Sequence, residues 1–232
     1  MIKWVRGVTI IAALSVMVTG VFILDAEEEL NQAYRAYERR DMDQAMRHAR
    51  RANFSSGDNK KIIRRALKLE YAIAIRLDHH EKAMGYLDQT ILLQPACGLC
   101  YLQRGDLEYR RENYTAALHD FEKGFENAAS VKPVTKAYYY VRQGLSHLAV
   151  GDNKKAQADS QNALESDPGS ALAFFLESKI RDKDGDIEGA NGNVQEAYRL
   201  GQKKARFFSS PEGDLWLRYY ADVLIRYKRS HR

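Results

Sequence analysis

The chain is poor in proline and cysteine, because its 232 residues include only four prolines and two cysteines. Leucine, alanine, arginine, glutamate, lysine and tyrosine are plentiful by comparison. A sequence so short of proline and so rich in helix-forming residues favours an all-α protein and argues against a sheet-rich one. Its length alone permits one or two compact domains.

A large excess of charge of one sign is also missing. The net charge is +5, and leaving out Lys3 and Arg6 near the N-terminus lowers it by two to +3. The remaining charges of both signs are mixed along the chain, whereas nucleic-acid-binding proteins normally carry a coherent basic stripe. We therefore expect no nucleic-acid partner.

Catalytic motifs are absent as well. The sequence has no phosphate-binding loop, no paired carboxylates and no Ser, His and Asp set typical of nucleophilic catalysis. His79 and His80 lack the helical spacing of a metal-binding pair. Residues 182–188 resemble a calcium loop, but the glycine comes too early and the distal glutamate is misplaced. We expect no enzyme, metal, cofactor or small-molecule substrate.

Residues 1–25 predict a signal anchor that crosses a membrane. Gly7–Leu24 contains no charged residue over 18 positions, which is near the minimum for a membrane-spanning helix. Lys3 and Arg6 precede this run, and acidic residues follow it from Asp25. Because the positive end tends to stay in the cytoplasm, we expect the N-terminus there and the rest of the chain in the periplasm or another extracytoplasmic space.

A cleaved secretory signal is the alternative to an anchor. The small residues Val18–Thr19–Gly20 offer a cleavage site, but the apolar run continues from Val21 to Leu24. A cleaved signal usually loses its hydrophobicity before the cut. The sequence thus favours the anchor and leaves cleavage open, and both outcomes place the rest of the chain outside the cytoplasm.

Four alanines mark an internal repeat. Ala83, Ala117, Ala156 and Ala190 are separated by 34, 39 and 34 residues. A helix–turn–helix unit of 34 residues is the period of the tetratricopeptide repeat (TPR). The segment 98–131 matches the family pattern at positions 4, 8, 20, 24 and 27 through Tyr101, Gly105, Ala117, Phe121 and Gly124.

The chain therefore resembles the TPR family, and the resemblance implies a right-handed superhelical solenoid of paired helices. It covers five TPR-like repeats, at 26–59, 64–97, 98–131, 137–170 and 171–204. Extra residues around 59–62 and 130–136 imply insertions that would locally widen or bend the superhelix. The spacing of the repeats also places turn-forming residues between the two helices of each unit.

Small side chains at positions 8 and 20 have a physical reason in this family. They lie where the first helix of a unit crosses the second, and a bulky residue there would cost about 1–3 kcal/mol by overpacking. Gly105 and Ala117, and likewise Gly144 and Ala156, occupy these positions. We expect all four to be buried.

Residues 205–232 predict a C-terminal capping helix with a basic tail. Ser209–Ser210–Pro211–Glu212 is typical of a helix start. Apolar and aromatic residues from Leu215 to Tyr227 then recur at helical spacing. Such a helix would cover the exposed edge of the last repeat. A partner-binding helix is the alternative.

Cys97–Gly98–Leu99–Cys100 is the feature most open to a chemical role. It precedes a predicted helix, whose dipole lowers the pKa of a thiol. The surrounding sequence lacks the strand–helix pattern of a thioredoxin-like domain, and no further zinc ligands lie nearby. A structural disulfide, an idle pair and thiol–disulfide exchange all remain open.

The resemblance also implies a concave groove that binds a protein or peptide partner. Its lining comes from positions 2, 5, 9, 12 and 13 of the first helix in each unit. These positions give a trough of apolar, aromatic and basic residues, formed by Tyr34, Tyr37, Arg65, Lys68, Ile75, Arg76, Leu99, Leu102, Asp106, Tyr109, Arg110, Tyr138, Val141, Leu145, Phe175 and Lys179, with Leu30, Leu148 and Leu172 at equivalent places.

Some family members hold chaperone C-termini in a clamp of Lys and Asn side chains. Lys68 and Arg142 fall on two clamp positions here, but Ala72 and Gln103 replace the asparagines. The clamp is incomplete. The sequence thus predicts a non-catalytic, membrane-anchored scaffold that assembles an envelope complex through its groove. Redox-linked maturation through Cys97 and Cys100 is the alternative.

Overall fold

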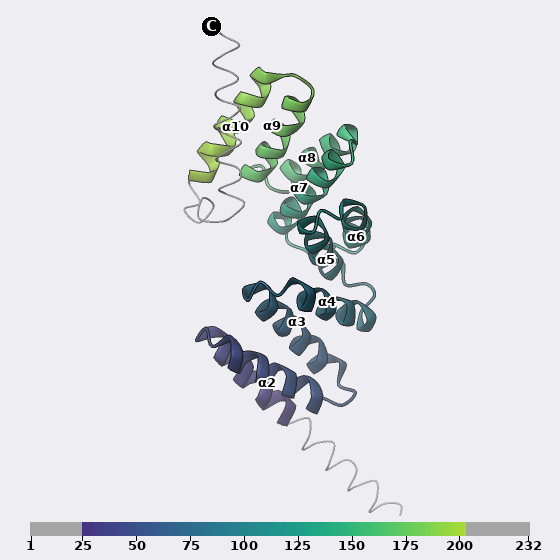
Figure 1. Ribbon diagram of the computed structural model, residues 1–232, viewed down its shortest axis with the longest axis vertical. Coiled ribbons are helices and arrows are strands. Elements are labelled where there is room, and N and C mark those ends of the chain that lie inside the picture. Colours follow the sequence, from purple (N-terminus) through teal and green to yellow (C-terminus); the bar gives the residue numbers. More distant parts are fainter. Residues whose placement is uncertain (1–24, 203–232) are drawn as a thin grey trace, which may run out of the picture. The chain divides into compact units, whose positions relative to one another are not determined.

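The computed structural model describes residues 25–202, and within this range the chain folds into helices joined by short turns (Figure 1). A helical segment at 25–38 is followed by α2 (Met42–Ser55), α3 (Lys60–Arg76), α4 (His80–Leu93), α5 (Gly98–Arg110), α6 (Tyr114–Glu126), α7 (Pro133–Ala149), α8 (Asn153–Ser166), α9 (Ala171–Lys183) and α10 (Ile187–Gln202). The helices form two compact units, which we call unit 1 (25–100) and unit 2 (101–202). The predicted capping helix and nearly all of the predicted anchor lie outside the described residues.

Five equivalent turns join the two helices of each repeat. In each turn one residue takes a left-handed backbone conformation, and these residues are Arg40, Asp78, Glu112, Gly151 and Gly185. The next amide N–H donates to a carbonyl five residues back, in the pairs Asp41–Ala36 (3.0 Å), His79–Ala74 (2.8 Å), Asn113–Glu108 (2.9 Å), Asp152–His147 (2.8 Å) and Asp186–Arg181 (2.9 Å). This bond satisfies a carbonyl that the ending helix leaves without a partner, so each turn stops its helix in the same way.

The repeat alanines lie at the contact between paired helices. Ala83, Ala117, Ala156 and Ala190 have no exposed surface. Gly105 and Gly144 are also buried. A Cβ at Gly105 would come within 3.1 Å of the Ala117 carbonyl oxygen, and a Cβ at Gly144 within 3.2 Å of Asp159 Cβ on the paired helix. The expectation that small residues occupy the helix crossings is therefore confirmed, because nothing larger fits there.

The extra residues between repeats lengthen helices instead of forming loops. α3 and α7 each have 17 residues, whereas α5 and α9 have 13. The difference of four residues is close to one helical turn, so the added residues extend the helix without rotating its packing face.

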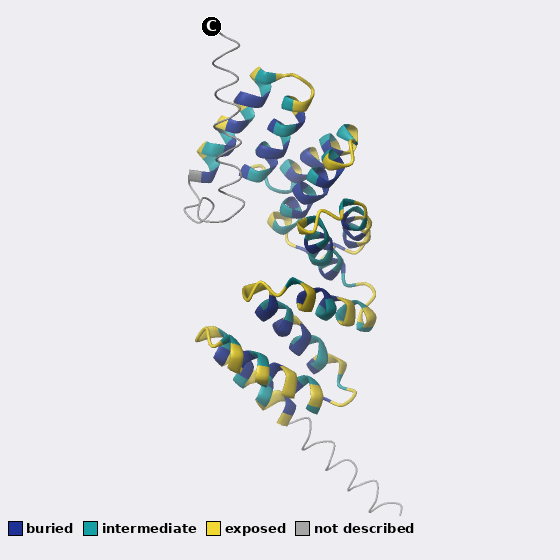
Figure 2. Ribbon diagram, viewed as in Figure 1, coloured by how far each residue is buried: buried dark blue, intermediate teal, exposed yellow. Residues whose placement is uncertain are grey.

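Each unit has its own core. In unit 1 the helical segment 25–38 packs with α2 and α3 around a cluster rich in alanine, which includes Leu30, Ala45 and Ile73. In unit 2 a second cluster between α7, α8 and α9 includes Val141 and Leu176. Buried residues follow the facing sides of the paired helices, and exposed residues cover the turns and the outer side of α2 (Figure 2). No helix within residues 25–202 is both long enough and apolar enough to cross a membrane.

Candidate functional site

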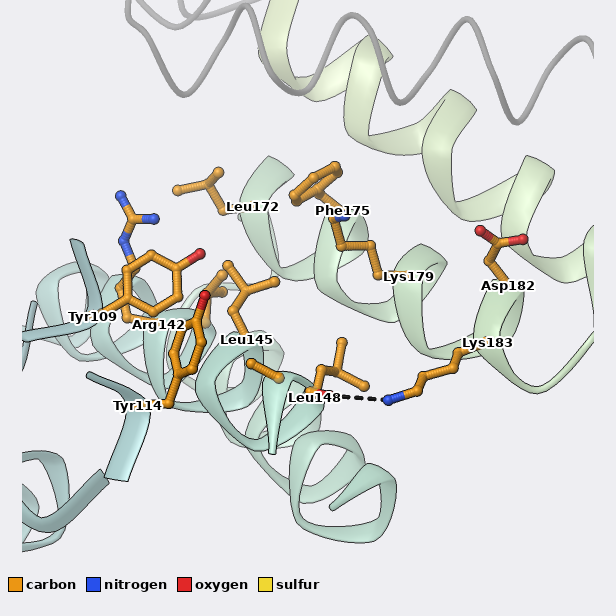
Figure 3. A pocket seen from close by; sticks show the side chains of 12 residues that line it. Tyr109, Tyr114, Arg142, Leu145, Leu148, Leu172, Phe175, Lys179, Asp182 and Lys183 are labelled. Atoms are coloured by element: carbon orange, nitrogen blue, oxygen red, sulfur yellow. Dashed lines mark hydrogen bonds between the residues drawn. The ribbon is translucent and has the colours of Figure 1, made fainter. Parts of the chain in front are cut away.

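Unit 2 contains a pocket with a volume of about 600 Å³. Its walls come from the end of α5, the start of α6 and one face each of α7 and α9 (Figure 3). The lining consists of Tyr109, Tyr114, Val141, Arg142, Leu145, Leu148, Ala149, Leu172, Phe175, Lys179, Asp182 and Lys183. A cavity of this size with an apolar floor and a few polar groups is typical of a binding site.

Helical spacing brings the apolar lining together. Val141, Leu145 and Leu148 recur at four and three residues along α7, so they share one face of that helix. Leu172 and Phe175 are three residues apart on α9, which packs against α7. The floor of the pocket therefore lies between the first helices of two successive repeats.

An aromatic and ionic network fixes one wall. The Arg142 guanidinium lies 5.0 Å from the centre of the Tyr109 ring and 5.0 Å from that of Tyr138. Its Nε donates to the Tyr138 hydroxyl at 3.0 Å and lies 3.0 Å from Asp106 Oδ1. The Tyr138 hydroxyl in turn donates to Asp106 at 3.1 Å. These contacts hold the Arg142 side chain in one orientation.

The same network affects the pKa values of Arg142 and Tyr138. Burial on its own would lower the pKa of the Arg142 guanidinium, but Tyr138 and Asp106 outweigh it and hold that pKa above its ordinary value. Burial also raises the pKa of the Tyr138 phenol. Arg142 is thus a permanent cation and Tyr138 a neutral hydrogen-bonding group at neutral pH.

Two lysines and an aspartate from α9 form the other side of the pocket. Lys179 Nζ lies 5.2 Å from the centre of the Phe175 ring, and burial lowers the pKa of this lysine while Asp182 opposes the effect. Lys183 Nζ donates to the Leu148 carbonyl at 2.9 Å, as the dashed line in Figure 3 shows. The pocket therefore combines an apolar floor with cationic groups on both sides.

Comparison with solved structures identifies the fold. The chain is similar to MamA from Desulfovibrio magneticus RS-1, with a TM-score of 0.65 and 16% identity over 77% of this chain and 96% of that one. It is also similar to YrrB, described as a TPR protein with an unusual peptide-binding site, with a TM-score of 0.61 and 16% identity over 76% and 86% of the two chains. The fold is that of a TPR array.

A third neighbour is PilW, a type IV pilus biogenesis factor, with a TM-score of 0.64 and 16% identity over 88% of this chain and 91% of that one. No protein-family model matches the sequence, and no curated protein matches it. The likeness therefore lies in the structure of the TPR array, and this sequence carries small residues and turns where the helix pairs require them.

Most of the predicted groove residues of unit 2 gather at the pocket. Tyr109, Val141, Leu145, Phe175 and Lys179 line it directly. Among the remaining predicted residues, Leu102 is fully buried in the core. Tyr138 and Asp106 belong to the network around Arg142, and Arg110 is bound to Asp106 at 3.0 Å.

The predicted groove residues of unit 1 do not line that pocket. Tyr34 and Tyr37 are half-buried against the first core, and Arg65 and Arg76 lie over their rings at 5.9 Å and 4.8 Å. Lys68, Ile75 and Arg76 are exposed, and Leu99 is half-buried. Arg65 is also 3.8 Å from Glu27. In this unit arginine side chains cover the aromatic rings that the sequence predicted as groove lining.

Four lining residues were missed from the sequence. Asp182 and Lys183 stand at positions 12 and 13 of the fifth repeat, so the rule used for the other repeats would have found them. Ala149 stands at position 13 of the fourth repeat, so the same rule covers it, whereas Tyr114 at the start of α6 lies outside the rule. The sequence places Arg142 only at a clamp position, whereas its contacts with Tyr109 and Asp106 depend on how α5 packs near α7.

The cysteine pair forms a disulfide at the start of α5. Cys97 and Cys100 are joined, with their Cα atoms 5.3 Å apart. Cys97 is half-buried, whereas Cys100 is 7% exposed. Elsewhere, no group of three or more His, Cys, Asp and Glu side chains within residues 25–202 is arranged to hold a metal ion.

Proposed function

We propose that the chain is a non-catalytic scaffold that holds a protein or peptide segment in the pocket of unit 2. The observation that carries this proposal is the preformed cavity between α7 and α9, with an apolar floor and Arg142, Lys179 and Lys183 around it. Such a surface suits an extended or helical segment that inserts an apolar side chain and carries acidic groups beside it. The peptide-binding site named for YrrB supports the same interpretation.

Site-specific photo-crosslinking in intact membranes tests this proposal. A photoreactive residue at Leu172 should form adducts with the partner, and the same residue at the exposed Lys154 on α8 should not. Leu172→Arg should reduce capture of that partner at least tenfold, because it places a cation in the apolar floor. Val150→Arg, at an exposed turn, is the matched control. Equal adducts at both positions, or unchanged capture by Leu172→Arg, would exclude the pocket as the binding site.

Membrane anchoring completes the proposal and rests on the sequence. The uncharged run Gly7–Leu24, with cations before it and acids after it, supports a single-pass anchor with the TPR array in the periplasm or another extracytoplasmic space. In that place the scaffold would help to assemble an envelope complex. An alkaline phosphatase fused after residue 232 should be active, since this enzyme folds only outside the cytoplasm, and an inactive but intact fusion would contradict the orientation.

Thiol–disulfide exchange through Cys97 and Cys100 is the second candidate function. It is favoured by the arrangement of the bonded pair, in which the partly exposed Cys97 precedes a helix and the buried Cys100 lies in its first turn. A Cys100→Ser variant should then trap a mixed disulfide between Cys97 and a thiol of the partner. A double serine variant that captures the partner and supports complex assembly as well as the parent chain would rule this function out.

A further inference from the structure

Unit 1 carries a concentrated basic surface that the average charge of the chain conceals. Between residues 47 and 68 the sequence has eight lysines and arginines and a single acid, Asp58. The cations are Arg47, Arg50, Arg51, Lys60, Lys61, Arg64, Arg65 and Lys68. They lie on α2 from Arg47 onward and on the first half of α3, two helices that pack against each other.

An aromatic side chain protrudes from the middle of this surface. Phe54 is 92% exposed near the end of α2. Arg50 and Arg47 precede it by four and seven residues, so all three lie on one stripe of the helix. Lys60 and Lys61 open the next helix and are exposed as well. A bulky apolar side chain with cations beside it is an unusual feature of a protein surface.

Two acids of the segment 25–38 contact cations of α2 and α3. Glu29 binds His48 at 2.6 Å and lies 3.8 Å from Arg51, and Glu27 lies 3.8 Å from Arg65. Arg50, on the side of the Phe54 stripe, instead donates to the Tyr86 hydroxyl of α4 at 3.4 Å. The buried Glu70 of α3 interacts electrostatically with Arg50. Asp43 at the start of α2 and Asp58 in the following turn are the other acids of this part of the sequence. The stripe therefore keeps an excess of positive charge.

Phe54 and residue 25 lie at the same end of the pair formed by the segment 25–38 and α2. The segment 25–38 and α2 run antiparallel through the turn at 39–41, and the contact of Glu29 with Arg51 sets their alignment. Residue 25 follows directly after the run Gly7–Leu24, which the sequence predicts to cross a membrane. An anchor at that point would hold the Phe54 surface close to the bilayer.

We propose that this surface docks onto an anionic lipid bilayer, with Phe54 inserted among the headgroups and Arg47, Arg50, Lys60 and Lys61 bound to lipid phosphates. The pairing of an exposed aromatic ring with flanking cations is the chemistry of interfacial membrane contact. A bilayer accepts a single protruding ring without needing a complementary pocket, which a folded partner would have to supply. The proposal is separate from the partner pocket of unit 2.

Leu92 provides a matched control within the same unit. Leu92 is the 29th residue of the repeat 64–97, just as Phe54 is the 29th residue of the repeat 26–59, and it is 83% exposed. Four residues before Leu92 stands the exposed Asp88, whereas Arg50 stands four residues before Phe54. The two sites therefore share exposure and position in the repeat but differ in the charge around them.

Fluorescence quenching in reconstituted full-length chain tests the proposal. With Trp4→Phe and Trp216→Phe as background, Phe54→Trp or Leu92→Trp gives a single reporter. The vesicles contain phosphatidylcholine with brominated acyl chains, either alone or with phosphatidylglycerol at about 2:1. We expect quenching of the reporter at position 54 in the anionic vesicles, at least a twofold loss of that quenching without phosphatidylglycerol, and no quenching at position 92.

A second set of measurements tests whether the docking requires positive charge. Lys60→Glu with Lys61→Glu should abolish the quenching at position 54, and these changes do not threaten the fold because acids are favoured at a helix N-terminus. Salt at about 0.5 M should act in the same direction. The proposal is overturned if the reporter at position 54 is not quenched, is quenched equally in both lipids, or is matched by the reporter at position 92. Crosslinking of position 54 to an acidic protein would likewise overturn it.

Discussion

A single buried carboxyl group inside a repeat affects the stability of its unit, which composition does not show. Glu70 of α3 is 2% exposed, and its Oε2 has no hydrogen-bond partner within the described residues. Burial raises the pKa of this carboxyl to about 7, although Arg50 and a hydrogen bond with Asn53 oppose the rise. The group is therefore easier to bury in its protonated form, and its charge at neutral pH is a cost to the fold of unit 1.

The stability of unit 1 should consequently fall as pH rises. The pKa of Glu70 is raised from 4.5 to about 7 on folding, so the folded state binds more protons in this range and loses about 3 kcal/mol of unfolding free energy by pH 8. Glu70→Gln should remove most of this loss and be more stable than the parent chain at pH 8. Urea unfolding at pH 5 and pH 8 measures it, with the exposed Glu38→Gln as control. Parallel pH profiles for parent and Glu70→Gln would refute the assignment.

At the scale of single helices, the five turns share a backbone but not a cap. The Asp41 side chain accepts from the Gln44 amide and Asp152 from the Lys155 amide, each three residues on. His79 begins α4 with a similar backbone conformation but makes no side-chain hydrogen bond to the helix. α4 thus starts with one more unsatisfied amide than α2 or α8.

Supplying the missing cap should stabilise α4. His79→Asp places a carboxylate where it can accept from the Lys82 amide, and the unfolding free energy of the chain should rise by about 1 kcal/mol. The reverse change, Asp152→Ala, should lower the stability of its own unit by a similar amount. Urea titration followed by circular dichroism checks both variants. An unchanged or lower midpoint for His79→Asp would show that its backbone does not permit the cap.

For the molecule as a whole, stability is distributed along the chain. Within each unit, helices pack on neighbours in sequence, as α2 does on α3 and as α7 does on α6, α8 and α9. A repeat array of this kind behaves as a row of local units coupled to their neighbours. Damage to one repeat should therefore open that repeat and those beside it before it affects distant ones.

Gly144→Ala tests this local coupling. A Cβ at this position meets Leu176 Cδ2 at 2.5 Å and Asp159 Cβ at 3.2 Å, so the variant should lose about 1–3 kcal/mol. Hydrogen exchange should rise in α7, α8 and α9 and stay unchanged in α2 and α3. Gly85→Ala in α4, where nothing lies within 4 Å, should instead slow exchange in its own helix pair. A uniform rise along the chain would contradict the local picture.

Much of the fold was readable from the sequence, because a repeat multiplies weak signals. The alanine spacing set the register of the repeats, and the turn residues located the reversals that the structure shows at Arg40, Asp78 and Glu112. The sequence predicts insertions before the second and fourth repeats, and the structure shows that they extend α3 and α7 by about a turn. A local widening or bending of the superhelix stays a prediction. Spacing gives the number of added residues and does not say whether they continue a helix.

The candidate site was only partly readable. Position within the repeat pointed to Val141, Leu145 and Phe175, because side chains at fixed register positions share a helix face. It did not reveal that Arg142 lies between the rings of Tyr109 and Tyr138. Nor did it show that arginines cover Tyr34 and Tyr37 in unit 1. The sequence alone determined the repeating helix pairs, since these depend on local spacing, but only tertiary structure decided where a cavity stays open, since that depends on how side chains of different helices fill space.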